Sequence, residues 1–421
     1  MRNKEWKKYK LSDITYKLGD GLHGTPKYDN NGEYYFINGN NLENGKIVIK
    51  PDTKKVSFTE YQKYKKELNN NTILLSINGT LGNIGYYNNE KVILGKSACY
   101  FNLKDGFSKD YVRYIMSTKS FKLFLENFAT GATIKNVSLD VMRNFEFYAP
   151  RKDLQDKIAK ILSNYDNLIE NNNKRIKILE EMAQKIYKEW FVDFKFPGHE
   201  TTTFKDSPLG KIPNDWEIKK VVELSTLSKG KSYKSSELVD KKDGLPFLNL
   251  KCVERDGGFK REGLKWFCGK YNDNHVVLPE DIIMAVTDMT QERKLVARPA
   301  RIPHNWYKKY IMSMDLVKLV ANNDINKTYL YSLLKYSNFS DEVKNHANGV
   351  NVLHLNPQNI EQFELVVASE PLRNNFGEIA KRIFNQIDVL YLKNENLKQT
   401  RDILLPRLIS GEINVENMEV L

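Results

Sequence analysis

The chain has 421 residues, a formal net charge of +12 and an isoelectric point near 9.2, and 41% of its residues are hydrophobic. This length provides material for about two or three domains, and no apolar run approaches the roughly 20 residues that a membrane-spanning helix needs. The excess of Lys and Arg favours nucleic acid as a partner, because side chains that neutralise phosphates release counterions. The basic N-terminal segment lacks the apolar stretch of a secretory signal, so we expect a cytoplasmic protein with no membrane partner.

The cysteines and histidines do not suggest a metal site. Cys99, Cys252 and Cys268 are an odd number, and no two of them have the spacing of a zinc knuckle or a redox pair. The 6 histidines are scattered, without a helical i, i+4 pair. We therefore expect three reduced cysteines that serve in packing, and no metal ion.

Residues 1–150 are predicted to form a first mixed α/β domain. Trp6 opens it within a basic segment, and short apolar segments rich in β-branched and aromatic residues follow, separated by Gly and Asn. That pattern is typical of an irregular β-rich domain. Residues 108–131 are predicted to be helical and to end at a C-capping Gly131, and a second β segment is predicted over 132–150.

A long helix is predicted next, within residues 151–196. Its seam residues recur at alternating steps of four and three, the spacing of a coiled coil. They are Ile158, Leu162, Tyr165, Ile169, Asn172, Ile176, Leu179, Ala183, Ile186 and Trp190. Residues 197–212 are polar and contain Pro and Gly, which predicts a linker.

The second half of the chain repeats the first. Trp216 opens a predicted second domain over 213–369, as Trp6 opens the first, and Tyr329 lies 218 positions after Tyr111. The same offset relates Phe339 to Phe121, Gly349 to Gly131, Phe363 to Phe145 and Leu372 to Leu154. A repeat this long indicates two duplicated domains rather than a solenoid, whose units have about 20 to 50 residues.

A second long helix is predicted within residues 370–421. The same phase places in its seam Phe376, Ala380, Ile383, Ile387, Leu390, Asn394, Leu397, Arg401, Leu404 and Leu408. Pro406 should terminate or kink its last turns. The sequence thus predicts an α+β fold in which two duplicated mixed α/β domains are separated by two long helices that form an antiparallel coiled coil. Asn172 and Asn394 either fix the register of the two helices or face solvent at a break in the seam.

A search for catalytic motifs gives little. The triplets Gly95-Lys96-Ser97 and Gly230-Lys231-Ser232 lack the earlier glycine of a phosphate-binding loop. Residues 356–359, Asn-Pro-Gln-Asn, lack the second Pro and the aromatic residue of an adenine methyltransferase loop, so we predict a turn there. Without a nucleophile, a metal site or a cofactor loop, a non-catalytic role is favoured.

Polar side chains on Gly-containing loops predict contacts with DNA instead. Asn and Gln can bond adenine in two places, and Lys and Arg suit phosphates. The candidates in the first domain are Thr25, Lys27, Asn38, Asn40, Asn78, Thr80, Asn83 and Lys96, and those in the second are Lys251, Arg255, Thr287, Thr290, Gln291, Arg293 and Lys294. Each of them, taken singly, also fits an ordinary solvated loop residue.

Three segments are typical of one known family: KIYKEWFVDF at 185–194, DIIMAVTDMTQ at 281–291 and LLPRLISGEI at 404–413. With the repeat and the Gly-Ala-Thr-Ile-Lys-Asn segment at 131–136, they make the chain resemble the specificity subunits of type I restriction-modification enzymes, the HsdS family. The resemblance covers nearly the whole chain. It implies a non-catalytic subunit whose two target-recognition domains each recognise one half of a gapped, asymmetric site in double-stranded DNA.

The resemblance also implies partners. Two methyltransferase subunits would bind S-adenosylmethionine and methylate adenine, and motor-nuclease subunits would use ATP and Mg²⁺ to cleave DNA, so we expect no cofactor in this chain. A helix over 153–191 would be roughly 55 to 60 Å long, which suits a rigid spacer between half-sites about 34 Å apart. Lengthening it by about one turn should therefore change the gap. An orphan bipartite DNA-binding regulator, or a coiled-coil scaffold without restriction partners, would share the charge and the helices.

Overall fold

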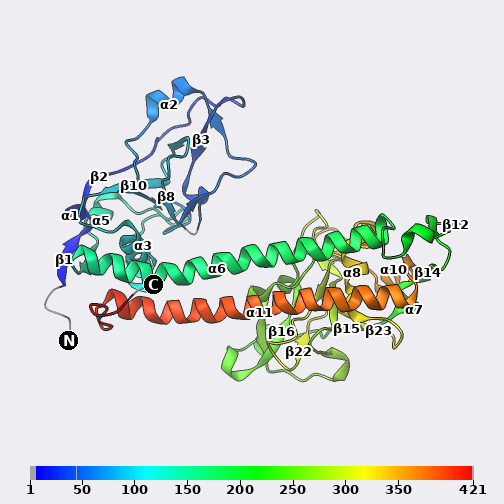
Figure 1. The fold of residues 1–421 in the computed structure, drawn as a ribbon. Helices are drawn as coiled ribbons and strands as arrows, with labels where there is room; N and C mark the ends of the chain where they lie inside the picture. Colours follow the sequence, from blue (N-terminus) through cyan, green and yellow to red (C-terminus); the bar gives the residue numbers. More distant parts are fainter. Residues whose placement is uncertain (1–5, 44, 420–421) are drawn as a thin grey trace. The chain divides into compact units, whose positions relative to one another are not determined.

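The computed structural model describes residues 6–43 and 45–419. They pack as two compact units. The first unit comprises the chain up to Ile169 together with the chain from Asn396 onward, and the second runs from Glu170 to Glu395. Two long helices, α6 and α11, each contribute one part to each unit (Figure 1).

The first unit contains the elements from β1 to β11, which we call the first domain. They are β1 (Lys7–Lys10), α1 (Leu11–Ile14), β2 (Thr15–Asp20), β3 (Tyr34–Ile37), η1 (Gly39–Asn41), β4 (Leu42–Glu43), β5 (Lys46–Ile47), β6 (Lys55–Val56), α2 (Phe58–Tyr64), β7 (Thr72–Ser76), β8 (Ile84–Tyr86), β9 (Val92–Leu94), β10 (Ala98–Leu103), α3 (Lys109–Ser117), α4 (Lys119–Phe128), α5 (Leu139–Arg143) and β11 (Glu146–Ala149). One sheet has the order β2-β10-β7-β8 and a smaller one the order β6-β3-β9, while β1 pairs with β11.

Both faces of the larger sheet in the first domain are buried. Side chains alternate between the faces of a strand, and Ile73, Leu75 and Phe101 accordingly join the core beneath α3 and α4. Leu74 and Tyr100 point the other way, into the core shared with the smaller sheet. Because both faces of the central strands β7 and β10 are buried, these two strands appear as nearly continuous apolar runs in the sequence.

The second unit contains the elements from β14 to β25, which we call the second domain. They are β14 (Glu217–Lys220), α7 (Val221–Leu224), β15 (Ser225–Lys229), η4 (Ser235–Glu237), η5 (Lys241–Asp243), β16 (Leu245–Leu248), η6 (Leu250–Cys252), η7 (Arg261–Gly263), β17 (Lys265–Phe267), η8 (Asp273–His275), β18 (Val276–Val277), β19 (Ile282–Ala285), β20 (Thr287–Asp288), β21 (Pro299–Arg301), β22 (Tyr310–Met312), β23 (Leu316–Ala321), α8 (Lys327–Tyr336), α9 (Phe339–Val343), η9 (Lys344–His346), β24 (Leu353–His354), α10 (Pro357–Glu361) and β25 (Glu364–Val367).

The second domain repeats the topology of the first. Its sheets have the orders β15-β23-β19-β21 and β17-β16-β22-β18, and β14 pairs with β25 as β1 pairs with β11. The starts of β10 and β23, of α3 and α8, of α5 and α10, and of β11 and β25 all differ by 218 positions. The predicted fold class, with its internal repeat, is confirmed.

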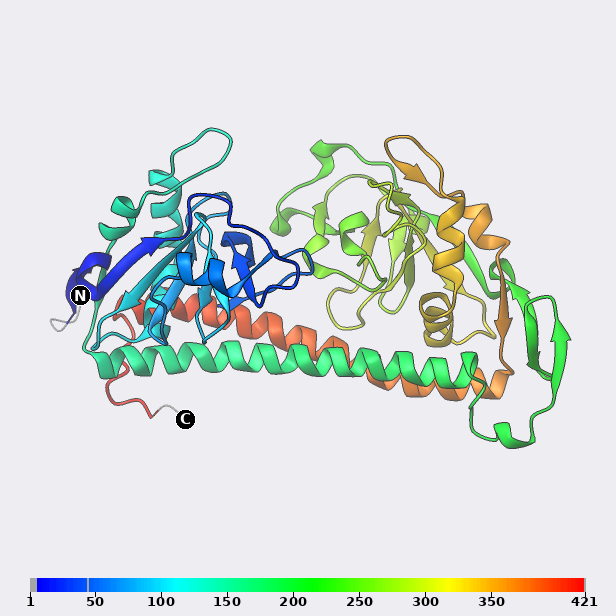
Figure 2. The same cartoon turned by 90° about the horizontal axis from the view of Figure 1, so that it is seen from above.

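The two long helices are α6 (Lys152–Tyr187), which continues through the single π-helical turn η2 (Lys188–Val192), and α11 (Glu370–Ile409). Within each unit their segments lie side by side and run antiparallel (Figure 1, Figure 2). Helix α11 passes through Pro406 and ends within one turn of it, at Ile409.

Several local predictions need correction. The predicted helix over 108–131 is two helices, because Thr118 adopts an extended conformation between α3 and α4 and its hydroxyl accepts a hydrogen bond from Phe121 N (3.3 Å). Gly131 follows the end of α4 and lies in a loop rather than at a helix C-cap. The second β segment contains helix α5, which Ser138 caps through a hydrogen bond from Val141 N (3.3 Å).

Two further segments differ from expectation. The predicted turn at 356–359 begins helix α10: Asn356 caps it, and Pro357 occupies the first helical position, where its missing N–H is not needed. The predicted linker contains the short helix η3 (His199–Thr201) and a hairpin of β12 (Phe204–Ser207) and β13 (Gly210–Pro213). Cys268 is exposed, so only Cys99 and Cys252 are packing residues.

Candidate nucleic-acid interface

Asn38 and Lys96 leave the smaller sheet of the first domain at the same edge. β3 and β9 are parallel neighbours, so the loops that follow them start side by side. The hydroxyl of Ser97 joins these loops, because it donates a hydrogen bond to Asn38 Oδ1 (2.9 Å) and accepts one from Gly39 N (2.9 Å). Asn38 is half-buried and holds the loops together, whereas the Lys96 side chain is exposed.

Asn78 and Asn83 lie on the loop between β7 and β8, next to the same edge. Gly79 and Gly82 adopt φ angles of +75° and +85° there, which side chains rarely allow, so the tight turn requires glycine. Asn83 Nδ2 approaches Gly39 O (3.4 Å). The structure thus brings together four candidate residues from three loops.

A further loop, residues 129–137, meets this group and was missed as a candidate contact region. Thr130 and Asn136 exchange backbone hydrogen bonds (2.8 Å each) and close it into a hairpin. Gly131 has a φ of +98°, and an added Cβ would lie 2.3 Å from Ile134 O. The loop projects from the first domain (Figure 2, teal), with Ile134 62% exposed and Lys135 exposed.

The 129–137 loop is bonded to the candidate loop at 78. Gly79 N donates to Lys135 O (2.9 Å), and Asn78 Nδ2 approaches Asn136 Oδ1 (3.4 Å). The exposed Lys135 therefore lies on the loop that Asn78 contacts. Gly131, which the repeat relates to Gly349, is the available sequence signal for this loop, although its place after a helical segment predicts a helix C-cap.

The remaining candidates of the first domain are exposed: Thr25, Lys27, Asn40 and Thr80. The segment that carries Thr25 and Lys27 starts beside the end of β9, where Leu22 N donates to Leu94 O (2.7 Å). Glu60 accepts a hydrogen bond from Lys27 N (2.9 Å), which fixes the backbone and leaves the Lys27 ammonium in solvent.

In the second domain, residues 288–296 form a loop organised around the carboxylate of Asp288. That side chain is 1% exposed and accepts hydrogen bonds from Thr290 N (2.9 Å), Thr290 Oγ1 (2.9 Å), Leu295 N (2.8 Å) and Val296 N (3.4 Å). Burial acts to raise the pKa of Asp288, but the hydrogen bonds from Leu295, Thr290 and Val296 outweigh it and lower the pKa. The charged form of Asp288 therefore holds the loop in shape.

The 288–296 loop contacts residues 348–354, the counterpart of the 129–137 loop. Asn348 and His354 exchange backbone hydrogen bonds (3.0 and 2.9 Å), and Gly349 has a φ of +150°. Gln291 Nε2 donates to Val350 O (2.7 Å). Figure 2 shows this hairpin in orange on the second domain. Both domains thus place a short hairpin against the segment that follows an inner strand of the larger sheet. This strand is β7 in the first domain and β19 in the second.

The side chains predicted to contact DNA in the second domain have unequal freedom. Thr287 is 4% exposed, in β20, and the Thr290 hydroxyl is bonded to Asp288. Arg293 adopts a φ of +53° and is partly buried, while Lys294 pairs with Glu292 (2.6 Å). Lys251 and Arg255 are exposed.

The predicted seam residues line the contact between α6 and α11. In the first unit, Ile158, Leu162 and Leu408 are buried, with Leu404 packed against them. In the second unit, the buried seam residues are Ile176, Ala183, Phe376, Ala380, Ile383, Ile387 and Leu390, with Leu179, Ile186 and Trp190 packed against them. Ile169 is also buried, and Tyr165, Leu397 and Arg401 are half-buried.

Asn172 and Asn394 face each other in this seam. Asn172 Nδ2 donates to Asn394 Oδ1 (2.9 Å), and Asn394 Nδ2 donates to Asn173 Oδ1 (2.8 Å). The two side chains are 8% and 3% exposed. The alternative that both face solvent is therefore wrong, and a role in fixing the register stays a prediction.

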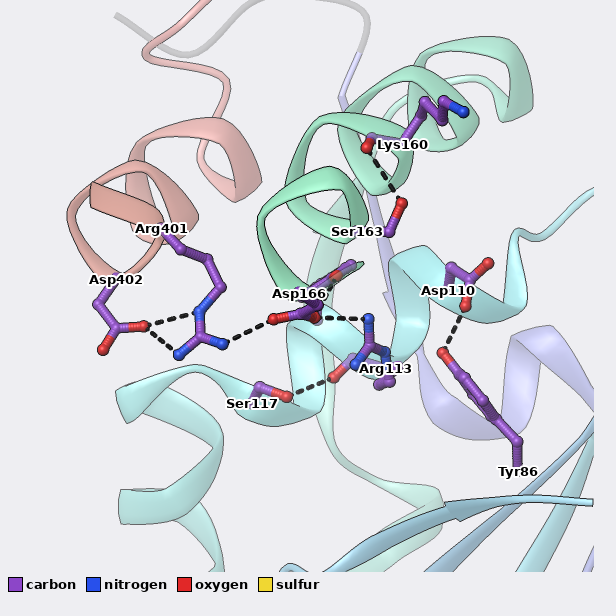
Figure 3. A network of polar contacts seen from close by, with 10 residues as sticks. Tyr86, Asp110, Arg113, Ser117, Lys160, Ser163, Asp166, Arg401 and Asp402 are labelled. Carbon is purple, nitrogen blue, oxygen red and sulfur yellow. Dashed lines mark hydrogen bonds and ion pairs between the residues drawn. The ribbon is translucent and has the colours of Figure 1, made fainter. Parts of the chain in front are cut away.

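A second polar contact joins the helices in the first unit (Figure 3). Asp166 of α6 accepts hydrogen bonds from Arg401 Nη1 of α11 (2.6 Å) and from Arg113 Nη2 (3.0 Å) and Tyr114 Oη (2.6 Å) of α3. Burial acts to raise the pKa of Asp166, but the hydrogen bonds from Tyr114 and Arg401 and the charge of Arg113 lower it. This carboxylate therefore ties the first domain to both helices.

Within residues 6–43 and 45–419, no group of three or more His, Cys, Asp or Glu side chains could hold a metal ion. None of the helices in that part of the chain combines the length and hydrophobicity needed to cross a bilayer.

Residues 3–181 and 213–401 each match the family described as the type I restriction modification DNA specificity domain. The chain belongs to this family. Its two matched segments correspond to the two halves of the repeat. The chain is therefore a DNA-recognition subunit of a type I restriction-modification system and not its catalytic component, which confirms the family and the function predicted from the sequence.

Proteins of this family from other organisms are similar to the chain over most of its length. The chain is 24% identical to the type I restriction enzyme MjaIX specificity subunit of Methanocaldococcus jannaschii, over 99% of this chain and 95% of that protein. It is 24% identical to the HindI specificity subunit of Haemophilus influenzae, over 70% and 75% of the two chains. The crystal structure of a type I restriction-modification system S subunit from M. genitalium has the same fold, with a TM-score of 0.59 at 18% identity, covering 97% of this chain and 96% of that one.

Proposed function

We propose that this subunit recognises a DNA site made of two unlike halves separated by a gap. Residues 1–150 act as one target-recognition domain and residues 213–369 as the other, each through its hairpin loop and the loops beside it. The helices within 151–196 and 370–421 act as the spacer that sets the gap, and residues 197–212 connect the halves.

The observation that carries this proposal is that the two domains share a fold and differ in the side chains at equivalent loops. The hairpin of the first domain presents Ile134 and Lys135 beside Asn78. That of the second presents Val350, which is 90% exposed, beside Gln291. One fold with two sets of loop side chains is suited to two different base sequences, because base edges are distinguished by hydrogen bonds and apolar contacts.

The loops differ in how their side chains would serve binding. Lys27, Lys96, Lys135, Lys251 and Arg255 are exposed cations suited to phosphates. Asn78 and Gln291, together with Asn40, Thr25 and Thr80, are candidates for contacts to base edges, whereas Asn38, Asn83, Thr287, Thr290 and Arg293 support the loops. Lys294 is held by Glu292 and would become available if DNA displaced that carboxylate.

We also propose the partners that the family role implies. Double-stranded DNA is bound together with two methyltransferase subunits and with motor-nuclease subunits, and the assembled enzyme methylates adenine or cleaves DNA with ATP. S-adenosylmethionine, ATP and Mg²⁺ then bind to those subunits. The subunit acts in the cytoplasm, where it meets double-stranded DNA.

Selection from random duplex DNA tests the proposal. The purified chain with its methyltransferase subunits is used to enrich duplexes, and the bound pool is sequenced. A two-part motif with a fixed gap and unlike halves is expected. A single contiguous motif would indicate an orphan regulator, and the absence of any motif would indicate a scaffold; either result would overturn the bipartite function.

A further inference from the structure

The contact between the two long helices contains polar pairs that the internal repeat does not duplicate. The repeat relates each residue of α6 to the residue 218 positions later in α11. Asn172 thus corresponds to Leu390, and Asn394 corresponds to Ile176. Leu390 and Ile176 are buried in the same apolar core of the second unit, so an amide pair on one side of the seam has an aliphatic pair as its counterpart.

The Asp166 contact is likewise polar in the first unit and apolar at the repeat-related positions of the second. Asp166 corresponds to Phe384, and Arg401 corresponds to Ala183; both counterparts are buried in the apolar core of the second unit. Arg113 corresponds to Tyr331, whose ring lies against Phe384 with centroids 5.4 Å apart. An ion pair in the first unit is therefore matched by an apolar contact in the second.

We infer that these polar pairs make the interface selective for one helix of each kind, so that α6 accepts α11 and disfavours a second copy of itself. If two α6 helices paired in the same antiparallel register, Asn172 would face Ile176 of the second copy. If two α11 helices paired, Asn394 would face Leu390 and Arg401 would face Phe384 of the second copy. A pair of two α6 helices, or of two α11 helices, would bury amides or charged groups without their partners. Leaving such a group unpaired in the interior costs much more free energy than losing the same hydrogen bond at the surface.

The selectivity follows from the position of the amides as well as their chemistry. A polar residue at one seam position is known to determine register and partner in coiled coils, at a cost in stability. Here each amide is at most 8% exposed, so water could not replace the lost partner. The aliphatic seam positions, by contrast, would accept either helix.

The consequence for DNA rests on the proposed function. A pair of like halves would carry two copies of one recognition domain and would recognise a symmetric site. Selective pairing keeps the two unlike domains in one assembly. The pairing preference itself can be measured without DNA, so its failure would be distinguishable from failure of the bipartite function.

The test uses the complete folded chain, cut after folding. A protease site is inserted at the tip of the β12–β13 hairpin, between Ser207 and Gly210, where Leu209 is 48% exposed; such tips tolerate insertions. Two cut preparations that differ in a mass tag are mixed, and the complexes are counted by native mass spectrometry. We expect tags to exchange between complexes that each hold one N-terminal and one C-terminal fragment. Complexes of two like fragments at their statistical share would overturn the inference.

Two variants identify the cause. In N172L/N394I, the two asparagines are replaced by the residues at the repeat-related positions, Leu390 and Ile176. We expect the ratio of like to unlike complexes to rise by about tenfold or more, because two like helices no longer bury unpaired amides. N171L/N396I makes the same substitutions at exposed asparagines and should leave the ratio unchanged. An unchanged ratio in N172L/N394I would show that the amides do not cause the pairing preference. The exchange measured on the unsubstituted chain shows whether there is a preference at all.

Discussion

Asn172 Nδ2 donates a hydrogen bond of 2.9 Å to Asn394 Oδ1 across the two long helices, between residues 222 positions apart in the chain. Both side chains are buried, and Asn394 Nδ2 in turn donates to Asn173 Oδ1 (2.8 Å). The stability of this seam therefore depends on the pair rather than on either residue, because a buried amide is costly only when its partner is missing.

Replacing one asparagine of the pair should destabilise the chain, and replacing both should not. We expect N172L or N394I alone to lower the free energy of unfolding by about 1–3 kcal/mol, and the double variant to recover most of that loss, because an aliphatic pair of similar shape needs no hydrogen bond. Urea denaturation of the four proteins gives the coupling energy. Losses that simply add would show that the two amides act independently.

The helices and the repeat could be predicted from the sequence because their signals are local or periodic. The seam from Ile158 onward alternates in steps of four and three, and Tyr111 and Tyr329 keep one offset. Both are visible without knowledge of tertiary contacts. Helix breaks were harder to predict: Thr118 interrupts a continuous amphipathic pattern through one side-chain bond, and residue preferences alone do not show that.

The candidate site was predicted only in part because its geometry is made of long-range contacts. Asn78 meets Asn136 through a bridge between segments 58 positions apart, and no spacing rule indicates it. Thr287 is buried because β20 pairs with β24, although the sequence around it is typical of a polar loop. Whether a loop hydroxyl is free or bonded to a neighbour such as Asp288 is decided by backbone geometry, not by residue type.

Acid should weaken the packing of the first domain on the helices through Asp166. The pKa of this carboxyl is lowered in the folded chain, so its contribution to stability is fully present above the ordinary aspartate value of about 3.9 and is lost as the pH falls through the lowered value. We expect D166N to be less stable than the unsubstituted chain near neutral pH, and the difference to shrink below about pH 4.

Unfolding free energies measured across pH check this expectation. D105N, which removes an exposed loop carboxylate, serves as the control and should follow the unsubstituted chain. A difference between D166N and the unsubstituted chain that stays constant down to the lowest pH would contradict the proposed role of the charge.

Asp288 should control the order of one recognition loop. In D288N an amide replaces the carboxylate that accepts four hydrogen bonds from the 288–296 loop, so we expect faster backbone hydrogen exchange there and in residues 348–354. In selections with the methyltransferase subunits, one half-site should become degenerate while the other keeps its sequence. Degeneracy in both halves would argue against independent domains.

Lengthening both helices together should widen the gap. Seven residues inserted between Ile169 and Glu170, and seven between Glu395 and Asn396, preserve the seam phase and add roughly 10 Å, or about three base pairs at 3.4 Å each. Both half-sites should keep their sequences in a binding selection. The sequence alone predicts that lengthening α6 by itself changes the gap, but the structure indicates that this insertion in α6 alone cannot keep both the Asn172–Asn394 pair and the Asp166–Arg401 pair, so it should reduce stability. An unaltered gap in the doubly extended chain would refute the spacer role.

Asn78 and Lys27 should affect binding in different ways. N78A removes an amide placed beside the 129–137 loop, and it should relax the preference at one base position by about 1–3 kcal/mol of discrimination. K27A removes an exposed cation and should weaken binding to all sequences while reducing the slope of affinity against salt by about one. Titrations of matched and single-substituted duplexes at several salt concentrations separate the two effects. If both variants lost affinity uniformly, Asn78 would be a backbone-positioning residue, and the base contacts of the first domain would have to come from Ile134, Lys135 or the loop at Asn40.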